Sequence, residues 1–258
     1  MKRSPNRPSN DRLALPIGIL DRGRRLRAVT LRAPDEHRRL LLDVDFSGPR
    51  ERAIGGALGA RIERPSSDCL GRLTLADRHW LIAQLMLRDG IDAIEIAEAC
   101  ARCGGLLELR LDLAAVVRDA EPEMMNRVDG VRLPTVRDLE RAGSSEEFLA
   151  SCAPDHTGDL AEIEQALSDA DPLGTVALNA ACCLCGNDVR VEIDLVARWL
   201  AIAQRAAHEL LEEVHALARH YHWSEREILA LNESRRQYYI ALCEAEHESD
   251  SLERQVYV

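Results

Sequence analysis

Apolar and polar positions alternate in two separate stretches of the chain, and each stretch predicts a β-hairpin. In the first stretch, apolar residues take every second position of residues 94–96 and 107–111; in the second, they do so in 176–178 and 189–193. Alternation with period two on both sides of a short turn indicates two antiparallel strands that share one buried face. We therefore expect two hairpins of similar construction.

A short amphipathic helix is expected in front of each hairpin. Thr74 starts the first helix as a hydroxyl cap, an apolar stripe follows at helical spacing, and Gly90 ends it. The stretch from Asp159 to Leu167 has the same character, and it precedes Gly174 and the second hairpin. A helix followed by a hairpin is therefore the expected repeating unit.

Beyond residue 195 the pattern becomes helical. Residues 196–220 contain neither proline nor glycine, and their apolar residues recur at helical spacing. After a break at residues 221–223, Ser224 and Glu227 have the spacing of a capping box that starts a second helix. We expect a C-terminal helical hairpin, which is a shape suited to docking on a partner.

The turns of the two hairpins contain the most specific motif of the chain, a Cys-x-x-Cys-Gly sequence that occurs twice. Both hairpins then end in Asp-Leu. The second copy lies 82 positions after the first at every equivalent residue, which indicates an internal duplication. The equivalent pairs are Cys100 and Cys182, Cys103 and Cys185, Gly104 and Gly186, Asp112 and Asp194, and Leu113 and Leu195.

The spacing of these cysteines predicts a zinc site. Two cysteines separated by two residues and followed by glycine form a turn that directs both sulfurs to one point, and glycine tolerates the required dihedral angles. Two such turns supply four thiolates, a closed tetrahedral shell that suits zinc and has no open position for a substrate. We expect one structural zinc ion per chain, held by Cys100, Cys103, Cys182 and Cys185.

Alternatives to this site stay open. The four cysteines could be reduced thiols or a redox pair, although a redox Cys-x-x-Cys normally starts a helix and each copy here leads into a strand. Cys183, inside the second motif, could replace Cys182 as a ligand. The other cysteines, Cys69, Cys152 and Cys243, have the character of small buried or incidental residues.

The whole pattern predicts an α+β protein with a duplicated body whose hairpins are zinc-ribbon-like. A weaker similarity between Val29–Asp35 and Val131–Thr135, each with a proline able to open a helix, extends the copies to about residues 25–118 and 125–195. The first copy would then carry an insertion of about 18 residues within Phe46–Asp68. The expected divisions are a disordered tail at 1–12, the body at 13–195, the helical hairpin at 196–247 and a flexible tail at 248–258.

Composition narrows the class of protein. A chain of 258 residues suffices for one large or two small domains with a proper core. The first residues are polar, and no stretch approaches the length of a membrane span, so we expect a cytoplasmic protein with reduced thiols and no membrane partner. The formal charge of −11 argues against nucleic-acid binding, because phosphate contacts need a basic surface.

We expect no enzyme and no small-molecule substrate. His208 begins a sequence similar to a zinc-protease helix, but Glu212 stands where the second histidine ligand would be. Arg235 and Arg236 stand beside two tyrosines and could contact phosphate, yet basic residues on a helix are usually solvated. No serine–histidine–acid array, phosphate-binding glycine loop or pair of carboxylates stands out.

Several segments carry a resemblance that touches most of residues 25–245. They are an Arg-x-Pro opening, Leu73–Arg78, the two cysteine hairpins and Leu211–Arg236. Together they resemble the baseplate hub assembly proteins of contractile-tailed phages and of phage-derived contractile injection systems. The resemblance implies a non-enzymatic assembly chaperone, or a minor component, that binds baseplate hub, spike or tail proteins. Members vary in whether they keep the cysteines, so the metal is argued from this chain alone.

The alternative function is a zinc-ribbon regulator that binds nucleic acid or a transcription component. It requires a contiguous basic face despite the acidic total, and binding to DNA that weakens as salt is added. A redox protein is a third class, and it would need an exposed thiol of low pKa.

Overall fold

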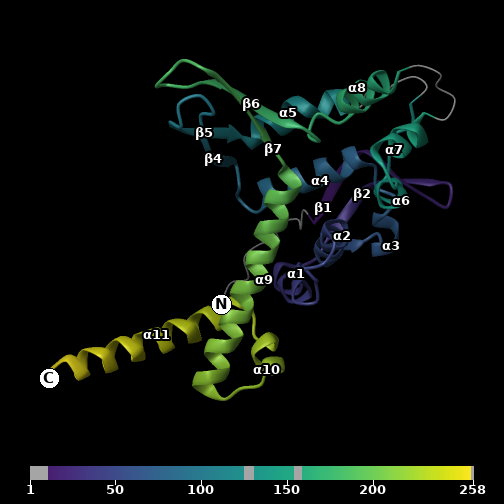
Figure 1. The fold of residues 1–258 in the computed structure, drawn as a ribbon. Helices are drawn as coiled ribbons and strands as arrows, with labels where there is room; N and C mark the ends of the chain where they lie inside the picture. Colours follow the sequence, from purple (N-terminus) through teal and green to yellow (C-terminus); the bar gives the residue numbers. More distant parts are fainter. Residues whose placement is uncertain (1–10, 125–130, 154–158, 257–258) are drawn as a thin grey trace, which may run out of the picture. The chain divides into compact units, whose positions relative to one another are not determined.

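The structure is a computed structural model that describes residues 11–124, 131–153 and 159–256, and it contains two compact units (Figure 1). The first unit comprises the chain up to Leu31 together with Ile62–Trp199. The second comprises Arg32–Arg61 and the chain from Leu200 onward. Helices alternate with small sheets, and a helical region follows at the C-terminus, in agreement with the predicted α+β class.

A three-stranded antiparallel sheet opens the first unit. Its strands, in the order β1-β2-β3, are β1 (Arg12–Asp21), β2 (Arg24–Leu31) and β3 (Ile62–Arg64). Leu15 and Ile19 of β1 are at most 2% exposed and belong to the core. β1 begins within residues 1–12, where a tail was expected, and residues 1–10 of that stretch lie outside the described residues.

The pairing of β1 with β2 contains a bulge that α4 (Leu75–Arg88) supports. The register shifts within residues 14–19, and Gly18 there has a φ of 86°, in the region that favours glycine. The fully buried carboxylate of Asp77 accepts hydrogen bonds from the backbone N–H of Ile17 (3.0 Å) and of Gly18 (2.7 Å). Burial raises the pKa of Asp77. One helix side chain therefore satisfies two donors that the bulge removes from the strand ladder.

α4 is the predicted helix in front of the first hairpin, and it supplies much of the core of the first unit. The side-chain oxygen of Thr74 accepts a hydrogen bond from the Asp77 N–H at 3.1 Å, which confirms the predicted cap. Gly90, with a φ of 85°, follows the last turn as expected. Four large apolar side chains of α4 are at most 1% exposed, and each contributes about 1.5–3 kcal/mol by burial. They are Leu81, Ile82, Leu85 and Met86.

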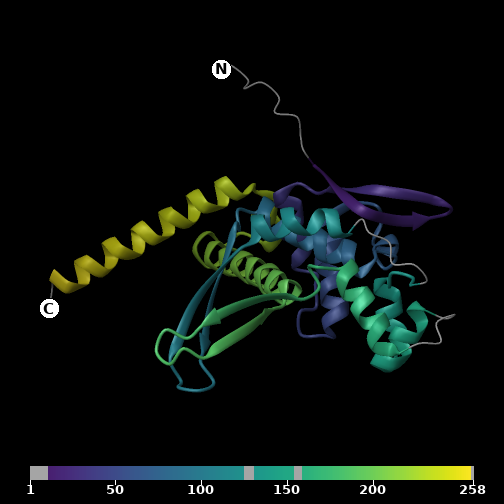
Figure 2. The same ribbon diagram turned by 90° about the horizontal axis from the view of Figure 1, so that it is seen from above.

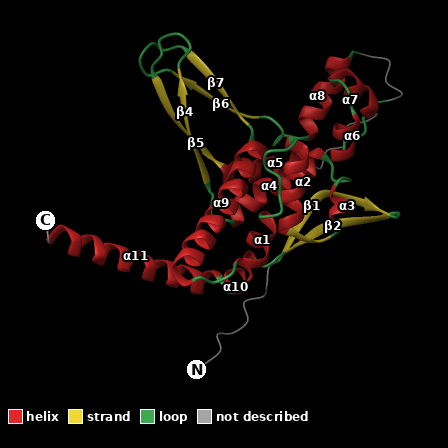
Figure 3. Cartoon of the chain, turned by 60° about the horizontal axis from the view of Figure 1, so that its bottom comes forward, coloured by secondary structure: helices red, strands yellow, loops and turns green. Residues whose placement is uncertain are grey.

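Both predicted hairpins are present, and their strands pair in the same register. Ile94 pairs with Leu111, and the residues 82 positions further on, Val176 and Ile193, pair with each other. Figures 2 and 3 show the two hairpins side by side with their turns at the same end. Each is a separate two-stranded sheet: β4 (Ala93–Ala99) with β5 (Leu106–Asp112), and β6 (Val176–Ala181) with β7 (Asp188–Ile193).

A helix follows each hairpin, and both helices begin in the same way. Asp112 caps α5 (Leu113–Met124), and Asp194 caps α9 (Leu195–Tyr221). In each case Oδ1 of the aspartate accepts a hydrogen bond from the backbone N–H three residues further on, at 2.9 and 2.8 Å respectively. The repeated Asp-Leu pair is thus a helix start in both copies.

Besides α5, three short helices of the described residues lie between the two hairpins. α8 (Leu160–Ala170) is the predicted helix in front of the second hairpin, and Asp159 caps it by accepting from the Ala161 N–H at 3.1 Å. The helices before it are α6 (Val136–Arg141) and α7 (Ser145–Cys152).

The weaker similarity between Val29–Asp35 and Val131–Thr135 predicted a proline in the first turn of a helix in both segments, and the structure shows this in the first segment only. Pro34 occupies the first turn of α1 (Pro34–Leu41), as expected. Pro134 instead precedes Thr135, the N-cap of α6, and its carbonyl accepts a hydrogen bond from the Leu75 N–H at 2.9 Å. The proline is extended because its segment pairs with the backbone in front of α4.

The second unit is helical. The sequence pattern places residues 32–61 in the first copy, whereas the structure groups them with the C-terminal helices. The second unit contains α1 and the part of α9 from Leu200, together with α2 (Arg50–Arg61), α10 (Glu225–Ala230) and α11 (Glu233–Val256). The short helix α3 (Ser67–Leu70) belongs to the first unit.

Within the described part of the chain, no helix combines the length and the apolar character that crossing a bilayer requires.

The second helix of the predicted C-terminal hairpin is divided in two. Ser224 and Glu227 form the predicted capping box of α10, but that helix ends at Ala230. The side chain of Asn232 accepts a hydrogen bond from the backbone N–H three residues further on, at 3.0 Å, and so starts α11 as a new helix. α11 then continues to Val256, past residue 247, where a flexible tail was expected to begin.

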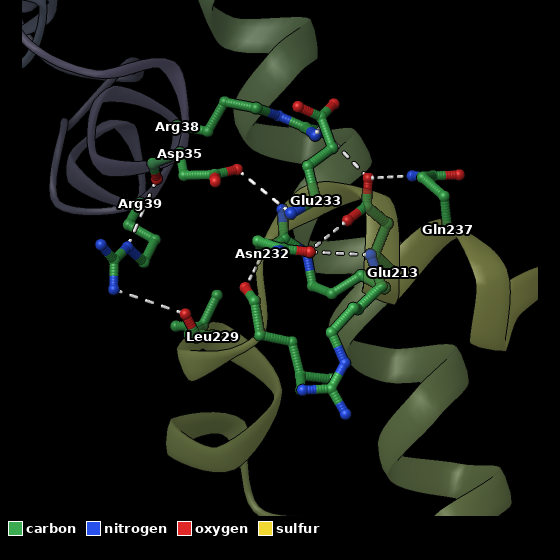
Figure 4. A network of polar contacts seen from close by, with 11 residues as sticks. Asp35, Arg38, Arg39, Glu213, Leu229, Asn232, Glu233 and Gln237 are labelled. Carbon is green, nitrogen blue, oxygen red and sulfur yellow. Dashed lines mark hydrogen bonds and ion pairs between the residues drawn. The ribbon is translucent and has the colours of Figure 1, made fainter. Parts of the chain in front are cut away.

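Glu213 of α9 is the centre of a polar network that joins α1 to α11 (Figure 4). Its carboxylate accepts hydrogen bonds from Arg38 (2.9 Å), Arg236 (2.9 Å) and Gln237 (2.8 Å). Arg38 also pairs with Glu233 at 2.7 Å. The expectation that Arg236 is a solvated helix residue is therefore wrong, since its side chain is 1% exposed and forms a buried ion pair.

Candidate metal centre

The two Cys-x-x-Cys-Gly motifs fold into turns with matching backbone hydrogen bonds. In the first turn, the Cys100 N–H donates to the Gly105 carbonyl (2.8 Å), and the Gly104 N–H donates to the Cys100 carbonyl (2.8 Å). In the second, the same bonds run from Cys182 to Asn187 (2.8 Å) and from Gly186 to Cys182 (2.9 Å). The two turns therefore have one local structure, repeated after 82 residues.

Glycine is required at the same position of both turns. Gly104 has a φ of 71° and Gly186 a φ of 68°, which is the left-handed region that residues with a Cβ rarely adopt. Apart from each glycine and its two neighbours in the chain, no described residue has an atom within 4 Å of the place where a Cβ would stand. The requirement is thus one of backbone conformation and not of space, as the motif predicted.

The structure brings the four predicted ligands together. All four sulfurs lie within 4.8 Å of one another. The sulfurs of Cys100 and Cys185 are 3.7 Å apart, as are those of Cys103 and Cys182, so both contacts cross from one hairpin to the other. Ligands 2.3 Å from a tetrahedral zinc ion stand about 3.8 Å from one another. The four cysteines, which are free thiols, therefore fit a single four-coordinate ion.

One cysteine of each pair is buried and the other is accessible. Cys100 and Cys182, the first of each motif, are 2% and 3% exposed. They pack with the buried Leu107 in a small apolar cluster shared by the two hairpins. Cys103 is exposed and Cys185 is half-buried. The cluster of four cysteines thus has an apolar inner side, and an outer side that water and ions can reach.

Backbone N–H groups favour the thiolate form at the buried position of each motif. Hydrogen bonds from the N–H of Leu184 and of Cys185 lower the pKa of Cys182 to about 6. The N–H groups of Arg102 and Cys103 lower the pKa of Cys100 in the same way. Because a metal binds the thiolate and not the thiol, this environment suits a ligand at Cys100 and Cys182. Among the free thiols of the cluster, burial and the neighbouring thiols raise the pKa of Cys103 and raise that of Cys185 to about 12.

The other sequence candidates lie outside this group. Cys183 is exposed and is not one of the four clustered cysteines, while Cys152 and Cys243 are buried elsewhere and Cys69 is half-buried. His208 and Glu212 form an exposed pair at 3.4 Å on one face of α9. Among residues that the structure describes, the four cysteines are the one set of three or more potential ligands that converges.

Two contacts between polar side chains of distant segments were not anticipated from the sequence. One is the network around Glu213. The sequence does contain an indication that Glu213 is buried, because it lies three residues after Leu210 and four before Leu217, on the buried face of α9. The other joins Nδ1 of His79 in α4 to Asp171 after α8, at 2.7 Å. Nothing in the spacing of these two residues pairs them, because 92 positions separate them.

The chain matches no protein-family model, no curated protein and no solved structure. Its function is therefore argued from its own residues and from the motifs described above.

Proposed function

We propose that this chain is a non-enzymatic assembly factor, or a minor component, for the baseplate hub of a phage tail or contractile injection system. It acts by binding other proteins, and one structural zinc ion joins its two hairpins. The observation that carries the proposal is the convergence of four cysteine sulfurs from two hairpins within 4.8 Å.

Zinc is the ion that best suits this set of ligands. Four thiolates select zinc or iron–sulfur centres over magnesium or calcium, which prefer oxygen ligands. Zinc uses all four cysteines in a tetrahedral shell and has no position left for a substrate. The ion would hold Cys100 and Cys103 of one hairpin to Cys182 and Cys185 of the other. Its role is therefore structural, and the two copies act as one body.

A binding role in tail assembly is supported by the family resemblance and by charge. The resemblance covers both the cysteine hairpins and the region Leu211–Arg236, part of the helical second unit. The charge of −11 disfavours phosphate contacts, which a nucleic-acid regulator of the zinc-ribbon type would need. A protein partner is accordingly the better proposal.

Co-expression with individual hub, spike and tail proteins from the same source tests this function. We expect a stable complex with one of them by size-exclusion chromatography, and weaker complex formation by the Cys100→Ser variant, which loses a ligand. Cys183→Ser is the matched control, because it removes a neighbouring thiol that lies outside the cluster. Absence of any such complex, together with DNA binding that weakens steeply with salt, would favour the regulator instead.

A further inference from the structure

A pocket of about 690 Å³ lies in the first unit and contains none of the four cysteines. It is formed by α7 and α8, which pack side by side (Figure 3), by the first residues of α4, and by the segments before α6 and after α8. Its volume falls within the range of about 300–1,000 Å³ that is typical of ligand sites. Its apolar wall is half-buried and includes Leu133, Phe148, Leu149 and Leu167.

The charged residues of this pocket all have one sign. Glu164 and Asp171 line it, and no lysine, arginine or histidine of the described residues does. Phe148, one of only two phenylalanines in the chain, stands on the same wall. An anionic ligand would be repelled here, whereas a cation next to an apolar group is complementary to both parts of the lining.

Asp171 has capacity for a further hydrogen bond. Its Oδ2 bonds to Nδ1 of His79 at 2.7 Å. Its Oδ1 is buried and has no hydrogen-bond partner among the residues that the structure describes. Buried carboxylate oxygens are normally paired, so this oxygen is an unmet acceptor among the described residues.

We propose that this pocket binds a partner protein segment in which a bulky apolar side chain stands beside an arginine or lysine. Half-buried apolar side chains at a solvent-accessible wall suit an inserted anchor residue, and the acidic groups select the basic neighbour. The surface is separate from the cysteine cluster, and the inference does not rest on zinc or on a role in tail assembly.

Titration of the full-length protein with two short peptides tests the proposal. The first probe is acetyl-Leu-Arg-Phe-Arg-amide, and the second is its charge-reversed form, acetyl-Leu-Glu-Phe-Glu-amide. We expect the basic peptide to shift the backbone amide signals of Leu133, of α7 and of α8 in a nitrogen–proton NMR spectrum. We expect the acidic peptide to bind at least tenfold more weakly.

Variants that change charge inside and outside the pocket show whether the basic peptide binds there. Glu164→Lys reverses one acidic group of the lining, and Ser168→Arg places a cation at the pocket wall; each should weaken the basic peptide at least tenfold. Glu140→Lys makes the same change of charge at an exposed residue of α6 outside the pocket, and it should leave binding unchanged. The proposal is overturned if neither peptide binds, if both bind equally, if the shifts lie elsewhere, or if all three variants behave alike.

Discussion

Replacing Glu213 with glutamine removes the negative charge on which two arginines of the second unit depend. The carboxylate accepts a hydrogen bond from Arg38 on α1 and another from Arg236 on α11, both at 2.9 Å. Arg38 keeps a second partner, Glu233, at 2.7 Å. Arg236 keeps only the backbone carbonyl of Leu231 among its described contacts, and its side chain is 1% exposed. Glu213→Gln therefore leaves a guanidinium buried without a counter-charge.

The expected loss of stability is large for a change of one charge. Each hydrogen bond to a charged group contributes about 1.5–3 kcal/mol, and breaking a buried pair by removing one partner costs about 3–5 kcal/mol. We expect the second unit to lose ~3–5 kcal/mol in Glu213→Gln. Glu212→Gln is the matched control, because Glu212 is 70% exposed and forms an exposed ion pair with His208 at 3.4 Å. That variant should lose ~0.5 kcal/mol or less.

Hydrogen exchange measured by mass spectrometry separates the two units, which one melting temperature cannot do. In Glu213→Gln, protection should fall in α1 although it lies more than 170 residues from the substitution, and in the first turns of α11. Protection of β4–β7 should stay as in wild type. Glu213→Leu combined with Arg236→Met should recover most of the loss, since an apolar pair can replace a buried ion pair. Equal exchange in the Glu213 and Glu212 variants would refute this account.

Two further predictions concern single residues. Burial of His37, with Arg61 and Arg38 nearby, lowers its pKa from 6.5 to about 4. Between these two pH values the unfolded chain therefore binds more protons than the folded chain. The second unit should accordingly lose stability as the pH falls from 6.5 to 4. The full shift corresponds to about 3 kcal/mol, reduced to ~2 kcal/mol by partial exposure of the ring. Somewhat more than half of this loss, ~1 kcal/mol, should appear between pH 7 and pH 5 in urea unfolding of wild type and not of His37→Gln, and an equal loss in both would contradict it. Gly104→Ala and Gly186→Ala should each cost about 1–2 kcal/mol, because a Cβ there meets no atom and only the positive φ is strained. Gly55→Ala, in α2 with equally open surroundings, should instead gain about 0.5–1 kcal/mol by thermal unfolding, and a similar response at all three glycines would argue against the turn conformation.

Features that depend on nearby residues could be predicted from the sequence. Alternation of apolar residues identified both hairpins, and the Cys-x-x-Cys-Gly spacing identified both turns with their positive-φ glycines. The caps at Thr74 and Ser224 follow from the same kind of local rule. Duplication then linked the two turns, since equivalent residues of two copies have equivalent roles. The convergence of all four cysteines was predictable for that reason.

Features that depend on distant partners could not be predicted in the same way. Arg236 has the sequence surroundings of a solvated helix residue, and its buried ion pair with Glu213, 23 positions away, is a tertiary contact that helical periodicity does not reveal. Residues 32–61 belong with the C-terminal helices because of this network, and periodicity carries no information about which helices pair. The break before Asn232 was missed because a single amide cap outweighed an otherwise continuous helical pattern.

The central claim is that one zinc ion clamps the two hairpins through Cys100, Cys103, Cys182 and Cys185. Its most direct test is the zinc content of purified wild type, Cys100→Ser, Cys185→Ser and the control Cys183→Ser, measured together with their thermal unfolding. The account predicts one zinc per chain in wild type and in Cys183→Ser. It predicts loss of zinc in the other two, with exchange protection lowered in both hairpins at once. A reduced wild-type protein that contains no zinc and unfolds identically with and without a chelator would contradict it.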